Sequence, residues 1–208
     1  DLDLTNSTLT APTIVDAVSI DCAGALVVDT TTAIAGATSL ATGAGLTAGT
    51  GISTVATAIY KTSVVTIGSI IYTDIMIDLT GLNSGGSIDD IIGKAATANC
   101  HIGQITAAVN GTIFGGKMTC LEVAAGGDPD VDLWYADEAT GVEDTLVTDL
   151  SNQNQLTNAG DHTIGLVTQF IDTKVPAANK YLYLACGAST DATYTSGKFL
   201  IQLVGYAA

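Results

Sequence analysis

Three aspartates at alternating positions are the first residues whose types and spacing could do chemistry. The run Asp128-Pro129-Asp130-Val131-Asp132 follows two glycines, as at the start of a calcium-binding loop. An EF-hand loop needs Gly at its sixth position and Glu at its twelfth, where this chain has Leu133 and Ala139. Because alternate residues of a strand share a face, the sequence favours a half-solvated strand over a metal site.

A second acidic group, Asp137-Glu138 and Glu143-Asp144, flanks Gly141. Paired carboxylates can hydrolyse glycosidic bonds, but that reaction takes place in a cleft that also holds the sugar. Aromatic sugar platforms are scarce here, because Trp134 is the only tryptophan, beside seven tyrosines and three phenylalanines. We therefore interpret the second acidic group as a surface turn.

The two histidines, His101 and His162, are candidate ligands or bases, and Cys100 adjoins the first. No second ligand lies at the short spacing of structural zinc sites, and Cys120, His162 and Cys186 could converge only through the fold. The chain also lacks a nucleophile elbow, a dinucleotide fingerprint, a phosphate loop and a zinc-protease helix motif. The sequence thus predicts a protein that is not an enzyme, with no catalytic residue, cofactor or metal.

The charge of the chain restricts its partners. Its 208 residues include 21 acids and six bases, all lysines, for a formal net charge of -15. Such a chain repels polyanions, and it lacks arginine, whose guanidinium group donates two hydrogen bonds at once to phosphate or guanine. We therefore expect no binding to nucleic acid or to an anionic membrane. No apolar run reaches the roughly 18 residues of a membrane helix. Charged residues make up only 13%, which indicates neutral faces covered by neighbouring subunits.

Residues 60–208 have the pattern of a β-sandwich. Between Val65 and Leu79 the apolar residues Ile67, Ile71, Ile75 and Ile77 share one parity, which predicts a long strand or a hairpin with one buried face. Gly, Asn, Asp and Pro separate this segment from further short strands, with residues 144–155 as the one helical or loop excursion. This rhythm predicts an all-β, antiparallel, jelly-roll-like β-sandwich. The further strands are expected at 89–93, 102–108, 112–123, 131–136, 162–171, 181–186 and 198–206.

Residues 1–59 differ in composition, since they contain no base and only small or aliphatic residues before Tyr60. They predict an N-terminal extended or fibrous arm, with a flexible Gly/Thr-rich arm as the alternative, and helix is disfavoured. The start at Asp1 indicates an N-terminus that is either processed or incomplete. The scattered cysteines, Cys22, Cys100, Cys120 and Cys186, are expected to be buried free thiols.

Several motifs of the globular part are similar to a widespread group of uncharacterised tailed-phage proteins, usually encoded among virion genes. They are residues 67–82, His101-Ile102-Gly103-Gln104-Ile105, Gly126-Gly127-Asp128-Pro129-Asp130 and Tyr194-Thr195-Ser196-Gly197-Lys198. The resemblance covers about residues 60–206. It implies a structural protein associated with the virion and transfers no catalytic residues.

The sequence and the resemblance together predict an auxiliary capsid protein of the decoration, cement or head-fibre kind, on the virion exterior. Its expected partners are itself, as a homotrimer, and other capsid or virion proteins. One alternative is a cell-surface structural subunit of the pilin or surface-layer kind. Another is a secreted carbohydrate-binding or hydrolytic domain, which would need a cleft lined by Trp134, the acidic groups or the histidines.

Overall fold

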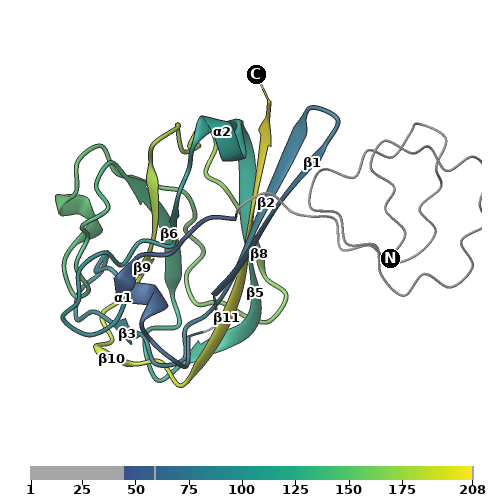
Figure 1. Cartoon of the computed structure of the whole chain (residues 1–208). Helices are drawn as coiled ribbons and strands as arrows, with labels where there is room; N and C mark the ends of the chain where they lie inside the picture. The colour runs from purple at the N-terminus through teal and green to yellow at the C-terminus, as the bar shows by residue number, and fades with distance from the viewer. Residues whose placement is uncertain (1–44, 59, 208) are drawn as a thin grey trace, which may run out of the picture. The chain divides into compact units, whose positions relative to one another are not determined.

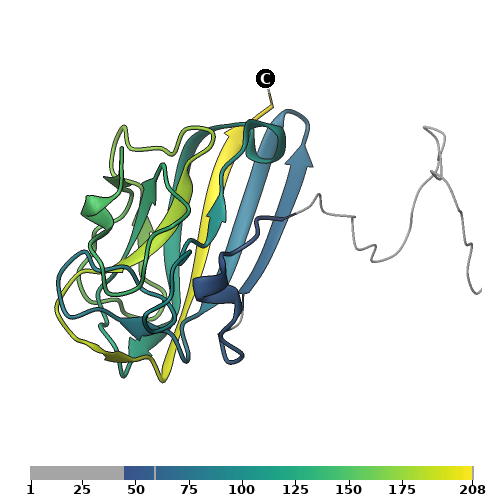
Figure 2. The ribbon, with the colours of Figure 1, turned by 60° about the vertical axis from the view of Figure 1, so that its left-hand side comes forward.

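The computed structural model describes residues 45–58 and 60–207, which form a sandwich of two antiparallel sheets (Figures 1 and 2). The larger sheet has five strands in the order β1-β2-β11-β5-β8, and the smaller has four in the order β4-β9-β6-β7. The prediction of an all-β antiparallel fold is confirmed. The strands of the larger sheet are β1 (Tyr60–Ile67), β2 (Ile70–Asp78), β11 (Ser196–Tyr206), β5 (Thr112–Ala125) and β8 (Val167–Gln169).

The other elements form the smaller sheet, a short ribbon and three helical turns. The smaller sheet contains β4 (Gly103–Gln104), β9 (Tyr181–Cys186), β6 (Val131–Ala136) and β7 (Asn154–Gln155). A two-stranded ribbon pairs β10 (Ala192–Thr193) with β3 (Asn83–Ser84). The helical turns are α1 (Thr50–Ser53), α2 (Ala107–Asn110) and the 3-10 turn η1 (Val147–Asp149).

The hairpin of β1 and β2 explains both the success and the failure of the parity prediction. Ile71, Ile75, Ile77 and Leu79 are buried as predicted, but Ile67 is 65% exposed. A two-residue turn at Gly68 and Ser69, with Gly68 at a φ of 62°, pairs Ile67 with Ile70. Directly opposed residues share a face, so the odd residues of β1 lie outward with the even residues of β2. The prediction that Ile67 is buried is wrong because the parity changes at the turn.

Four of the further strand predictions hold. β5, β6, β9 and β11 occupy the ranges expected for them. The segment 102–108 instead divides into β4 and α2, because the Thr106 hydroxyl accepts a hydrogen bond from Val109 N and caps a helical turn. Residues 162–171 contain only β8, and residues 89–93 make isolated bridges. The excursion at 144–155 holds η1 and β7.

Both faces of the smaller sheet are covered. Its inner face packs against the larger sheet in the main core, to which β6 contributes Val131 and Leu133. Its other face carries Trp134 and Tyr183, which pack with Ile91, Val147 and Cys100 in a second apolar cluster. Loops from residues 89–100 and 137–150 therefore form a third layer over this sheet.

The domain begins earlier than predicted. Leu46 and Ile52 are buried in the main core, and Gly49 N and Gly51 N donate to the carbonyl oxygens of His101 and Asn99, respectively. A boundary at residue 60 is therefore too late, and the single helical turn α1 forms within the segment for which helix was disfavoured. Gly51 packs closely against Cys100, since a Cβ on Gly51 would lie 2.3 Å from Cys100 Sγ. Tertiary contacts of this kind override the low helix propensity of the segment. The predicted arm before residue 45 and Cys22 lie outside the described residues.

Candidate functional site

Two of the three alternating aspartates, Asp128 and Asp132, are buried and hold neighbouring segments together, while Asp130 is half-buried. Asp128 is fully buried, and its carboxylate accepts hydrogen bonds from Asp130 N at 2.9 Å and Ala188 N at 3.0 Å. Asp132 is 3% exposed and accepts from Gln155 Nε2 at 2.8 Å. The expected alternation of faces holds, but the prediction of a half-solvated strand is wrong because the loop layer covers the face that carries Asp132.

Burial changes the proton affinity of this group of carboxylates. Burial first, and then the charge of Asp130, raise the pKa of Asp132 to about 7. Burial and the neighbouring Asp128 carboxylate also raise the pKa of Asp130. Within residues 45–58 and 60–207, no group of three or more His, Cys, Asp or Glu side chains is arranged to hold a metal ion.

The second acidic group is likewise tied to the backbone. Glu138 Oε2 accepts from Ser151 N at 2.8 Å, and the buried Glu143 accepts from Ala96 N at 2.7 Å. Asp144, at a φ of 60°, accepts from Gly86 N, and Asp137 pairs with Lys180. Each carboxylate thus fixes a turn of the loop layer, and the structure does not gather these four side chains around a cleft.

His162 lies beside the run Asp128–Asp132, and its backbone N–H donates to the carbonyl oxygen of Pro129 at 3.3 Å. His162 is buried, donates from Nε2 to the carbonyl oxygen of Val131 at 2.8 Å, and stacks edge-on against Phe199. His101 packs edge-on against Tyr181 with ring centroids 4.9 Å apart, and burial lowers its pKa. It lines a hollow of about 540 Å³ with uncharged residues such as Leu46 and Gln104. Trp134 is only 7% exposed, so it is not a sugar platform.

The three described cysteines are buried free thiols, as predicted. Burial raises the pKa of Cys100 to about 11 and that of Cys186 to about 12, and it also raises the pKa of Cys120. A nucleophilic cysteine needs the opposite shift. These thiols therefore serve as small core residues.

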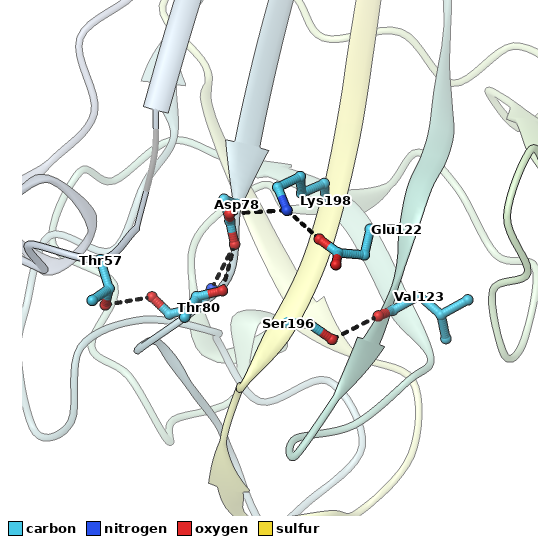
Figure 3. Close-up of polar contacts among 7 residues, drawn as sticks. All are labelled: Thr57, Asp78, Thr80, Glu122, Val123, Ser196 and Lys198. Atoms are coloured by element: carbon cyan, nitrogen blue, oxygen red, sulfur yellow. Dashed lines mark hydrogen bonds and ion pairs between the residues drawn. The ribbon is translucent and has the colours of Figure 1, made fainter.

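The outer face of the larger sheet is graded from charged to apolar. At one end Lys198 bridges Asp78, at 3.4 Å, and Glu122 (Figure 3). Beyond this ion-pair end, the strand register sets side chains in rows across the sheet. A polar row joins Asp74 and Gln202, whose Nε2 donates to Asp74 Oδ1 at 3.0 Å.

The other end of this face is apolar, and we call it the apolar end. One row is Val65–Tyr72–Val204–Gly115, and the last is Ile67–Ile70–Tyr206–Thr112. Ile67, Tyr72 and Tyr206 are 65%, 42% and 44% exposed, and Phe114 beside them is 55% exposed. None of these residues is charged, in a chain with a net charge of -15. Contiguous exposed apolar residues of this kind mark contact or ligand sites.

Sequence reasoning missed the apolar end. Its rows combine residues of the β1–β2 hairpin with residues of β5 and β11, which are distant from the hairpin in the sequence. The one local signal was the pair Gly115-Gly116 inside a strand, since a glycine there often marks a bulge or a close approach.

Comparison of the chain with protein-family models, with curated proteins and with solved structures found no match. In the part of the chain that the structure describes, no helix is long and apolar enough to cross a membrane.

Proposed function

We propose that this chain is a structural subunit of a tailed-phage virion, an auxiliary capsid protein that acts through protein contacts on the capsid exterior. The observation that supports this best is the outer edge of β1. One side of β1 pairs with β2, and among residues 45–58 and 60–207 no strand pairs with its other side. Unpaired N–H and C=O groups along an edge recruit a further strand.

The far half of this edge lacks the usual protection against strand addition. Ser63-Val64-Val65-Thr66-Ile67 contains no charge and no proline, and its pairing with β2 is continuous. Lys61 is the only charged residue of β1 and lies before Ser63, so it opposes strand pairing only in the first half of the strand. The exposed Ile67 ends the strand. Soluble monomers usually block such an edge with lysine, proline or a bulge. An edge of this kind suits a subunit that is covered in an assembly.

The partner strand comes from another capsid protein or from a second copy of the chain. If the partner surface differs from the edge itself, the contact is heterologous and can close into a ring, as in the proposed homotrimer. The opposite edge strand, β8, has three residues and offers much less backbone for pairing.

The test uses capsids that lack the protein. We expect the wild-type chain to co-sediment with them, and the double variant Ser63→Lys/Ile67→Lys to bind at least about tenfold more weakly, because lysine on an edge opposes strand pairing. The matched control is Ile164→Lys/Val167→Lys, which adds the same charge at exposed residues in and before β8. Equal binding by the β1 variant, or absence of the protein from purified virions by mass spectrometry, would contradict the proposal.

A further inference from the structure

A small hollow lies within the apolar end, on the side toward the polar row. Its volume is about 260 Å³, and it is lined by residues of β2, β11, β5 and β8. Two of them are aromatic: Tyr72 lies opposite Val204, and Phe114 precedes Gly115 at an irregularity in the pairing of β5 with β11. We call this the Gly115 hollow. It lies on paired strands inside the sheet and is distinct from the free edge of β1.

The absence of a side chain at Gly115 creates the hollow. Gly115 lies opposite Val204 on the outward face, and a Cβ built on it would meet no atom within 4 Å. The next residue, Gly116, lies opposite the buried Leu203, and a Cβ there would come within 2.5 Å of the Phe170 ring. The two glycines therefore do different things: Gly116 admits Phe170 on the inner side, and Gly115 leaves outer surface open. No neighbouring atom requires a glycine at Gly115, which lies next to an irregularity in the pairing of β5 with β11.

The walls of the hollow are aromatic and exposed. Tyr72 and Phe114 are 42% and 55% exposed, and Tyr206 extends the surface with its ring centroid 6.4 Å from that of Phe114. Burial and packing account for most other aromatic side chains of the domain, Phe199, Tyr183, Tyr194 and Trp134 among them. An aromatic ring presents a broad flat apolar face at low entropic cost, which suits stacking against a flat ligand.

The rim of the hollow on the side of the ion-pair end supplies hydrogen-bonding groups. Asp74, Gln202, Lys117 and Gln169 form one row of the sheet and line the hollow. The Gln202 amide donates to Asp74, which fixes both side chains and leaves further oxygen and nitrogen sites for a ligand. The Asp74 and Lys117 charges are opposite, so the rim is neutral.

We propose that the Gly115 hollow binds a sugar unit of a neutral glycan. The C–H face of a pyranose ring stacks on Tyr72 or Phe114, while its hydroxyls hydrogen-bond to the carboxylate and amides of the rim. The net charge of -15 disfavours anionic glycans. The volume of the hollow lies below the ~300–1,000 Å³ of pockets for drug-sized ligands. A hollow of this size fits one small ring better than the surface of a partner protein. This site does not depend on the proposed contact at β1.

The experiment measures retardation of the full chain in native gels that contain dextran, mannan, galactan or β-glucan. We expect retardation by at least one of these neutral polysaccharides, and about a tenfold or greater loss of its association constant in Gly115→Val. That variant fills the hollow but keeps the fold, because the added Cβ enters open space and valine suits a strand. Tyr72→Ala is a second variant, which removes one wall and should weaken binding similarly.

The matched control is Thr119→Val, which adds a valine at another outward position of β5. It should be retarded like the wild type. Retardation of Gly115→Val equal to that of the wild type would overturn the proposal, as would no retardation of the wild type in any of the four gels. Sedimentation of the same proteins tests whether a second copy of the chain occupies the hollow instead. If Gly115→Val has a lower mass in solution than the wild type, and no gel retards the wild type, the hollow is a contact between copies and the glycan site is overturned.

Discussion

Asp132 shows how a single buried carboxylate makes the stability of this domain depend on pH. It has one hydrogen-bond donor, Gln155, and its Oδ1 atom has no partner among the described residues. Burial raises its pKa to about 7, whereas an unfolded chain has an aspartate pKa near 3.9. Between these values the folded state holds a proton that the unfolded state releases. The contribution of this protonation to the free energy of unfolding is therefore fully present below about pH 4, and it is lost as the pH rises to about 7.

The variant Asp132→Asn should remove this dependence, because asparagine keeps the acceptor for Gln155 and never ionises. We expect its free energy of unfolding to exceed that of the wild type by roughly 1–3 kcal/mol at pH 8 and to match it near pH 4. Urea denaturation at the two pH values measures both differences. The exposed Asp149→Asn is the control and should change little at either pH. A gain of equal size at both pH values would show that the ionisation of Asp132 is not the cause.

At the scale of the element, the hairpin of β1 and β2 holds one isoleucine that is buried and one that is exposed, so their contributions to stability should differ. Ile75 lies opposite Ile201 in the middle of the sheet and is fully buried, while Ile67 lies at the turn and is 65% exposed. Ile75→Ala should destabilise the domain by about 2–5 kcal/mol, because it leaves a cavity. Ile67→Ala should stay within about 0.5 kcal/mol of the wild type. Thermal or urea unfolding of the two variants checks this, and comparable losses would place both side chains in the core.

The same element shows what could be predicted from sequence. Alternation over Ile71, Ile75 and Ile77 is a local property, so the strand and its buried face could be predicted. The parity change at Gly68 depends on one turn conformation, and the same letters also allow a continuous strand. The Gly115 hollow needs the register of four strands, which no local pattern fixes. The loop layer over Asp132 depends on contacts between residues about 40 positions apart, such as Cys100 N to the carbonyl oxygen of Gly141.

At the scale of the whole molecule, the sandwich depends on a segment that composition alone assigned to the arm. Leu46 and Ile52 are 7% and 1% exposed, and a Cβ on Gly103 would lie 2.6 Å from Leu46, so the two chain segments are in close contact. The Tyr60 hydroxyl donates to the carbonyl oxygens of Leu46 at 3.3 Å and of Ile102 at 2.6 Å. Residues 45–58 thus join the edge of the larger sheet to the loop before β4. The composition of this segment is low in bulk, but its few large side chains all face the core.

A chain that begins at Gly45 should therefore fold, and one that begins at Tyr60 should not be equally stable. Each buried aliphatic side chain contributes about 1.5–3 kcal/mol, so removal of Leu46 and Ile52 should lower the free energy of unfolding by at least about 3 kcal/mol. The loss also includes the backbone bond from Lys94 N to the carbonyl oxygen of Gly51 at 2.7 Å. Urea unfolding of the two chains measures the difference. Leu46→Ala/Ile52→Ala in the longer chain should reproduce most of it, because these two side chains carry most of the burial. If the chain from Tyr60 proved as stable as the chain from Gly45, then the two sheets alone would suffice for the fold.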